Sequence, residues 1–192
     1  MKDDWLNIQP ALEAGDVVLL PTETVYGLAA RADMAEAISK IYAIKGRHFD
    51  KPLAVCVRDI EQAKTLAYFD NTSARLAAAH WPGPLTLVLD IRMETKLDPR
   101  VTGKMNDTPT IALRCPDALW RSSIDVPLGL TSANRSRQPD CIEYKDAMNE
   151  LGDEVAASLA AEAPLSGKPS TIIRVENGKL SILRQGALEI SL

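Results

Sequence analysis

Two polar segments near the start of the chain carry side chains that could bind a charged ligand. Residues 21–28 contain two threonines, a glutamate and a tyrosine, directly after a short apolar run. Lys45, Arg47 and Lys51 follow as a cluster of cations. Because guanidinium groups bind phosphate oxygens in a planar fork and lysine adds a point charge, this cluster could hold a triphosphate. The alternatives are a strand-to-helix turn for residues 21–28 and pairing of the cations with a helix dipole.

Two further segments combine small polar groups with arginine. In residues 131–134, Ser132 and Asn134 follow an apolar run and could donate to phosphate oxygens alongside backbone N–H groups. In residues 110–114, alternation puts Thr110 and Arg114 on one face of a strand, where Arg114 could hold a carboxylate. The alternatives are an ordinary turn for the first segment and a surface ion pair for the second.

Several established signatures of catalysis are missing from the sequence. It contains neither G-x-x-x-x-G-K-[ST] nor G-x-G-x-x-G, so a nucleotide would have to bind by another arrangement. The chain has two histidines and three scattered cysteines, Cys56, Cys115 and Cys141, which fit reduced thiols and make a zinc site improbable. We therefore predict no metal bound by the protein itself. We also predict no covalent nucleophile, so that catalysis would rest on positioning and charge neutralisation.

Alternating strand and helix patterns are expected to position these residues. Helical spacing predicts helices over residues 6–14, 33–45, 59–68, 71–80 and 143–151, the second capped by Asp33. Apolar runs predict strands over residues 17–21, 53–57, 85–91, 110–113, 128–131, 171–175 and 180–183. Asn177-Gly178 between the last two runs indicates a β-hairpin. The pattern predicts an α/β protein with a mixed sheet whose middle is covered by helices on both faces.

Length and charge limit the class of protein. The 192 residues, 46% of them hydrophobic, favour one domain over residues 1–192. The net charge of −4 argues against a protein that coats nucleic acid through bulk positive charge. The start of the chain does not read as a secretory signal, and no apolar run reaches the ~20 residues that span a bilayer. We expect a cytoplasmic protein without membrane contact.

Seven short motifs, taken in order, resemble those of the YrdC/TsaC family. They lie at residues 21–28 (PTETVYGL), 45–47 (KGR), 51–53 (KPL), 81–86 (WPGPLT), 111–114 (IALR), 132–134 (SAN) and 170–173 (STII). The likeness covers roughly residues 10–186 and is closest to the single-domain bacterial form. Three positions depart from the family pattern. Arg137 stands where a glycine is frequent, Gln185 replaces the proline of Arg-Pro-Gly, and Cys56 lies where relatives can carry histidine.

The resemblance implies a twisted mixed sheet flanked by helices, with a large positively charged central cavity. It implies an L-threonylcarbamoyladenylate synthase, a nucleotidyltransferase that makes threonylcarbamoyl-AMP and pyrophosphate from L-threonine, bicarbonate and ATP. Residues carried over as threonine contacts are Thr24 and Arg114, and those carried over as ATP contacts are Lys45, Arg47, Lys51, Thr110, Ser132, Asn134 and Arg184. Mg²⁺ would arrive with ATP as substrate, and no tightly bound cofactor is expected.

The resemblance also implies partners. The product would pass to the threonylcarbamoyl-transfer proteins of the same pathway, which modify tRNA to threonylcarbamoyladenosine. One alternative keeps the same cations without nucleotide chemistry: a factor that binds structured RNA during tRNA or rRNA maturation. Another is a protein on the same fold that uses a different carbamoyl compound or hydrolyses its substrate.

Overall fold

One mixed β-sheet organises the protein. The computed structural model describes residues 2–190. The strands are β1 (Val18–Pro21), β2 (Tyr26–Arg31), β3 (Ala54–Cys56), β4 (Leu85–Asp90), β5 (Thr102–Met105), β6 (Thr108–Arg114), β7 (Leu128–Ser132), β8 (Ala157–Ser158), β9 (Thr171–Glu176) and β10 (Lys179–Arg184). Their order is β10-β9-β4-β6-β3-β7-β2-β1-β8, with β5 paired to β6. Three pairs are parallel (β3/β6, β4/β9 and β1/β8), and the others are antiparallel.

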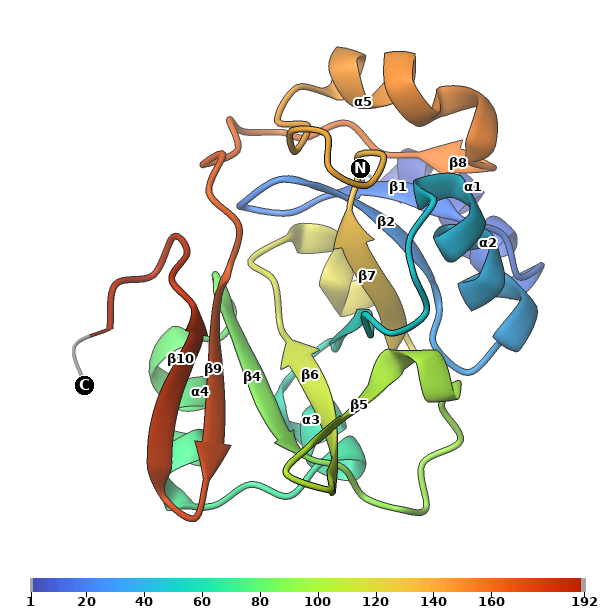
Figure 1. The fold of residues 1–192 in the computed structure, drawn as a ribbon. Coiled ribbons are helices and arrows are strands. Elements are labelled where there is room, and N and C mark those ends of the chain that lie inside the picture. The colour runs from blue at the N-terminus through green and yellow to red at the C-terminus, as the bar shows by residue number, and fades with distance from the viewer. Residues whose placement is uncertain (1, 191–192) are drawn as a thin grey trace.

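Five α-helices accompany the sheet. They are α1 (Lys2–Glu13), α2 (Ala35–Lys45), α3 (Ile60–Leu66), α4 (Asn71–His80) and α5 (Tyr144–Leu151), with short 3₁₀ turns at Pro99–Val101, Leu119–Ser123 and Gly152–Glu154. Figure 1 shows α1 and α2 beside β1 and β2 at one end of the sheet, and α4 beside the β9–β10 hairpin at the other. The predicted α/β class and mixed sheet are confirmed. Among residues 2–190, none of the helices combines the length and apolar character needed to cross a bilayer.

The sheet buries side chains on both of its faces. Alternation along β1 sends Val18 and Leu20 toward α1, where they join Ile8 in one apolar cluster, whereas Leu19 joins the larger cluster beneath α2. All four residues are fully buried. Burial on both faces explains why β1 reads as a continuous apolar run instead of an alternating one.

The Asn177-Gly178 hairpin prediction is confirmed, and a second hairpin was missed. Asn177 and Gly178 have φ values of 50° and 77°, as a tight two-residue hairpin turn requires, and they join β9 to β10. Asn106 and Asp107 also have positive φ, 47° and 64°, and join β5 to β6. The sequence analysis predicted neither this turn nor β5, because β5 is short and partly exposed and lacks an apolar pattern.

Two local expectations were wrong. Residues 21–28 do not lead from a strand into a helix: the chain turns at residues 22–25 and returns as β2, antiparallel to β1. Helix α2 begins at Ala35, and Asp33 does not cap it. The Asp33 carboxylate instead accepts two hydrogen bonds from the guanidinium of Arg31, at 3.0 and 2.7 Å, which removes it from the helix start.

Candidate active site

Two adjoining cavities lie where the polar segments meet. The first has a volume of about 250 Å³, and the second has about 470 Å³. They share Arg47 and Ser132, so the two cavities adjoin at these residues. The first is lined by Thr22, Val25, Tyr26, Gly27, Arg47, Pro52, Leu53, Ala54, Thr86, Ala112, Arg114, Leu130, Thr131, Ser132, Asp140, Pro169, Ser170, Ile172 and Arg184. The second is lined by Lys45, Gly46, Arg47, His48, Lys51, Ser132, Asn134, Arg135, Ser136 and Arg137.

Small residues on the sheet make room for the first cavity. Gly27 of β2, Ala54 of β3 and Ala112 of β6 all line it, and each lies on a different strand. Gly27 has no space for a larger residue, because a Cβ there would lie 2.8 Å from Leu130 Cδ1 and 3.2 Å from the Thr131 carbonyl oxygen. The floor of the cavity is therefore the sheet itself, and longer polar side chains surround that floor.

Arg114 is held at the end of β6 with part of its guanidinium unused. Its Nη2 donates to Glu23 Oε1 at 2.9 Å and to Thr24 Oγ1 at 2.8 Å, and its side chain is only 8% exposed. Its Nε is buried and has no acceptor among the described residues. A buried donor without an acceptor is costly. Arg114 also lines the first cavity, where the part of its guanidinium that faces the cavity can bind an anionic group.

Thr24 lies behind Arg114 instead of on the cavity wall. It is fully buried, and its hydroxyl contacts Thr22 Oγ1 at 2.8 Å as well as Arg114. Of the two threonines in this turn, Thr22 is the one that lines the cavity. The turn at residues 22–25 is fixed from outside, because Ser166 N and Gly167 N donate to the carbonyl oxygens of Glu23 and Thr24 at 3.0 and 2.9 Å.

Lys45 connects the two polar segments of the second cavity. Its Nζ donates to the carbonyl oxygens of Ser132 and Asn134 and to Asn134 Oδ1, the last at 2.9 Å. Burial lowers the pKa of Lys45 to about 8; the positive charge of Arg47 adds to this effect, and Asp140 opposes it. All three donors of the ammonium group are occupied by the loop after β7, so Lys45 positions that loop and contributes charge from beneath it.

Arg47 and Lys51 lie on the loop between α2 and β3. Gly46 allows the helix to end there, because its φ of 57° is the left-handed conformation that glycine adopts easily at a helix C-terminus. Arg47 Nε donates to the carbonyl oxygen of Lys51 at 2.9 Å, and Nη2 donates to that of Pro52 at 3.1 Å. These bonds fix the guanidinium at the junction of the cavities, while Lys51 is exposed on the second.

Ser132 is the last residue of β7, and Asn134 follows it in the next loop. Ser132 Oγ donates to Asn134 Oδ1 at 2.6 Å, and Asn134 Nδ2 donates to the carbonyl oxygen of Gln138. Both residues line the second cavity, as their position after a buried strand predicts. Their side chains are tied to the loop, so they present a fixed polar edge to a ligand.

Arg184 reaches the first cavity from β10 through Ser170. Its Nε and Nη2 donate to the Ser170 carbonyl oxygen at 3.1 and 2.8 Å, and Ser170 Oγ contacts Thr86 Oγ1 at 2.8 Å. Thr86 and Ser170 both line the cavity, although the sequence analysis quoted them only within motifs. Thr110 is different: among the described residues it lies outside both linings, buried between Asp90 of β4 and Gly103 of β5.

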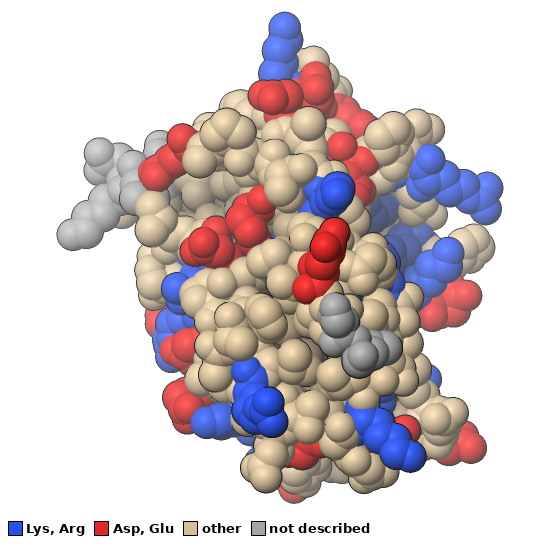
Figure 2. Space-filling model, turned by 90° about the vertical axis from the view of Figure 1, so that its left-hand side faces the viewer, with Lys and Arg blue, Asp and Glu red and all other residues tan. Residues whose placement is uncertain are grey.

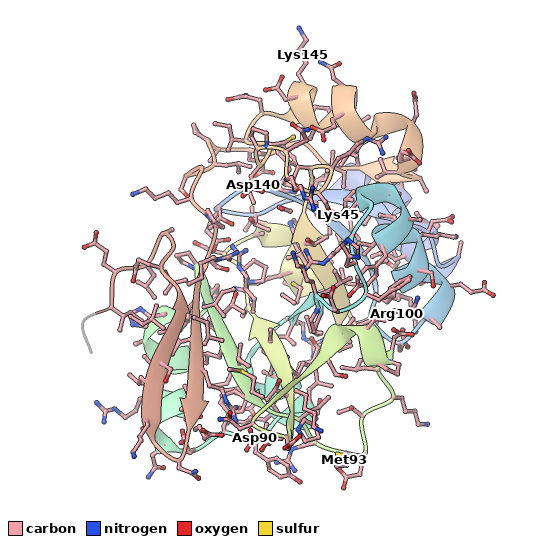
Figure 3. All side chains as sticks on the ribbon, in the orientation of Figure 1. Lys45, Asp90, Met93, Arg100, Asp140 and Lys145 are labelled. Carbon is pink, nitrogen blue, oxygen red and sulfur yellow. The ribbon has the colours of Figure 1, made fainter. Side chains whose placement is uncertain are left out.

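Asp140 and Arg137 were not among the predicted site residues. Asp140 is the one carboxylate among the described residues that line the first cavity, and none of these residues bonds its side chain. Asp140 lies in the loop after β7, and Figure 3 labels it near Lys45. Arg137 lines the second cavity. Both lie in a turn-rich segment whose sequence predicts neither a helix nor a strand. Hydrophobic periodicity therefore gave no indication of where either side chain would lie.

Comparisons with known proteins identify the family to which the chain belongs. A family model named Sua5/YciO/YrdC, described as telomere recombination, matches residues 10–186. A putative threonylcarbamoyl-AMP synthase of Methanocaldococcus jannaschii is 33% identical over 92% of this chain and 82% of its own length. The threonylcarbamoyl-AMP synthase of Bacillus subtilis is 36% identical over 92% of this chain, which spans 51% of that relative.

Among solved structures, P. abyssi Sua5 complexed with L-threonine superposes with a TM-score of 0.84 and 30% identity. The match covers 95% of this chain and 54% of that chain. The chain therefore spans about half the length of the Bacillus relative and of the P. abyssi protein. Because the family model matches residues 10–186, and a relative that is 33% identical matches over 82% of its own length, this protein belongs to the Sua5/YciO/YrdC family.

Proposed function

We propose that this protein is an L-threonylcarbamoyladenylate synthase, a nucleotidyltransferase that converts L-threonine, bicarbonate and ATP into threonylcarbamoyl-AMP and pyrophosphate. The names of its relatives support this activity, as does the L-threonine complex of P. abyssi Sua5. One observation of this chain carries the proposal: Arg114, held by Glu23 and Thr24, lines a cavity that adjoins a second cavity rich in cations.

The charges of the two cavities suggest a division of labour. The first combines Arg114 with the carboxylate of Asp140, which suits the opposite charges of an amino acid. The second combines lysines and arginines with no carboxylate among its described lining residues, which suits a triphosphate. Arg47 and Ser132 line both. The α-phosphorus of ATP would then lie near these two residues, close to the bound threonine.

The reaction needs positioned substrates more than a protein nucleophile. The threonine amine attacks bicarbonate carbon, and water leaves to give a carbamate. A carbamate oxygen then attacks the α-phosphorus of ATP, and the bond to the β-phosphate oxygen breaks to release pyrophosphate. Arg114 would hold the threonine carboxylate, Asp140 its ammonium group before the proton is lost, and Arg47 the charge that develops on phosphate.

A magnesium ion would be bound mainly by the nucleotide. Among residues 2–190, no three His, Cys, Asp or Glu side chains gather into a metal site. The lining near the shared wall offers the Ser132 hydroxyl, the Asn134 amide and the Asp140 carboxylate, which leaves most of the octahedral ligands to phosphate oxygens and water. The protein would work as a single domain in the cytoplasm, and its product would serve the proteins that modify tRNA.

Pyrophosphate release tests the proposed reaction. The purified chain is incubated with ATP, Mg²⁺ and bicarbonate, with and without L-threonine, and pyrophosphate and threonylcarbamoyl-AMP are quantified. We expect both products only when threonine and bicarbonate are present. Pyrophosphate at an equal rate without threonine contradicts the assignment. The same experiment with L-serine measures how far the threonine methyl group contributes to recognition.

The alternative of an RNA-binding factor without chemistry receives less support. Figure 2 shows lysine and arginine interspersed with aspartate and glutamate on the face it draws, instead of gathered into one basic surface. The concentrated positive charge lies in the cavities, whose size suits a nucleotide rather than an RNA helix. RNA affinity with a steep dependence on salt, combined with no binding of ATP, would favour this alternative.

A further inference from the structure

Arg137 has an unusual backbone conformation for its residue type. Its φ is 75°, in the left-handed region, where a side chain with a Cβ is disfavoured. The other non-glycine residues described with positive φ are Asn106, Asp107 and Asn177. Those three lie at hairpin turns and belong to the types that tolerate this region. Arg137 does not lie at a hairpin turn and is not one of these residue types. The local fold alone therefore does not account for an arginine at this position.

The surrounding loop imposes this conformation on residue 137. Ser136 N donates to the Lys45 carbonyl oxygen at 2.9 Å, and Gln138 N donates to that of Arg135 at 3.0 Å. The Asn134 side chain donates to the Gln138 carbonyl oxygen. Hydrogen bonds on both sides of residue 137 therefore fix the chain path without using its side chain. A glycine would fit the same path without strain.

The side chain of Arg137 lines the second cavity. No hydrogen bond or ion pair joins its guanidinium to any described residue. Its neighbour Arg135 lines the same cavity, but its guanidinium is bound to the Ile44 carbonyl oxygen at 3.2 Å and to Glu154 Oε1 at 3.2 Å. Arg137 is therefore free to bind a ligand, whereas Arg135 is anchored to the protein.

We propose that Arg137 is a phosphate-binding residue that grips the pyrophosphate portion of the nucleotide, the β- and γ-phosphates. The left-handed conformation of residue 137 is tolerated because it accompanies a guanidinium on the wall of a cavity whose described lining residues include no carboxylate. The choice of ATP as the ligand rests on the proposed function. The binding of a pyrophosphate group does not depend on the reaction that follows.

Three substitutions separate the backbone contribution from the charge. Arg137→Gly removes both the strain and the charge. Arg137→Asn removes the charge and introduces a residue type that tolerates positive φ. Arg137→Lys keeps the charge and the strain. Arg135→Asn is the matched control, because it removes a cation from the same cavity without relieving a left-handed residue.

The measurements are Tm without ligand, and Kd for pyrophosphate, ATP and AMP by calorimetry. For Arg137→Gly we expect Tm to rise by about 2–4 °C, the shift that relief of one strained residue gives in a chain of this length. We expect its Kd for pyrophosphate and ATP to rise about tenfold, with Kd for AMP unchanged. Arg137→Asn should behave in the same direction, Arg137→Lys should retain Tm and most of the affinity, and Arg135→Asn should not raise Tm.

Two results would overturn the proposal. An Arg137→Gly protein with higher Tm and unchanged Kd for pyrophosphate would show that the arginine is not a phosphate ligand. A lower Tm would show that the backbone carries no strain at this position. Neither result depends on turnover. If the wild-type protein releases no threonine-dependent pyrophosphate but Arg137→Gly still weakens pyrophosphate binding, the proposed reaction fails and the phosphate site stands.

Discussion

Replacing Arg114 by lysine tests the amino-acid subsite most sharply. The guanidinium uses Nη2 for Glu23 Oε1 and Thr24 Oγ1, at 2.9 and 2.8 Å, and leaves Nε buried without an acceptor. Lysine keeps the positive charge beside Glu23 but supplies one compact ammonium group in place of a planar fork. It can satisfy the turn at residues 22–25 or a ligand carboxylate, but it cannot grip the ligand in bidentate fashion.

The expected effect follows from the loss of one hydrogen bond between charged groups. Such a bond contributes about 1.5–3 kcal/mol, which corresponds to a rise of about 10- to 150-fold in KM for threonine. The assay is threonine-dependent pyrophosphate release at saturating ATP and bicarbonate, with KM for ATP measured alongside. KM for ATP should change little, because Arg114 lines only the first cavity.

Stability measurements show whether the site remains intact. Arg114→Lys should unfold near the wild-type temperature, since Glu23 keeps a positive partner. Arg114→Met should lose about 3 kcal/mol of unfolding free energy, because the partly buried Glu23 carboxylate then loses its ion-pair partner and keeps only the Asp117 N–H, and adding Glu23→Gln should restore much of that loss. A folded Arg114→Lys enzyme with KM for threonine within twofold of the wild type would refute the assignment of the carboxylate to Arg114.

Three further predictions concern the cavity walls. Asp140→Asn should raise KM for threonine about tenfold while leaving inhibition by 2,3-dihydroxybutyrate, which lacks the ammonium group, unchanged; equal weakening of both ligands would remove Asp140 from this role. Calorimetry should show ATP affinity falling as pH rises through about 8, because burial lowers the pKa of Lys45 to that value from 10.5, and Lys45→Arg should remove this step. Between pH about 8 and 10.5, Lys45 is protonated in the unfolded chain but deprotonated in the folded protein. The free energy of unfolding should therefore rise with pH over this range. Gly186→Ala should cost about 1–3 kcal/mol in chemical denaturation, because a Cβ there would collide with the backbone of Pro169 and Ser170; a variant as stable as the wild type would contradict the close approach.

Much of the fold could be predicted where local patterns and tertiary packing agree. The α4 helix begins at Asn71 with Asp70 as its cap, and the Asn177-Gly178 hairpin joins the strands expected on either side of it. Continuous apolar runs such as residues 17–21 mark strands that are covered on both faces. The β5 strand was missed because its position depends on pairing with β6 and not on burial of its own side chains.

The candidate site was predictable by residue type but less so by position. Alternation along β6 puts Thr110 and Arg114 on one face, yet the cavity reaches only to Ala112, because Thr110 is enclosed by β5. Thr24 lies in the expected segment, but the hairpin turn directs its hydroxyl to Arg114 and leaves Thr22 on the wall. Asp140 could not be predicted, since only the path of the chain after β7 brings it back over the sheet.

A crystal structure of the protein soaked with L-threonine and a non-hydrolysable ATP analogue tests the central claim most directly. We expect the threonine carboxylate within hydrogen-bond distance of the guanidinium of Arg114. We expect the triphosphate in the second cavity beside Arg47. Threonine bound elsewhere, without a contact to Arg114, would contradict the account.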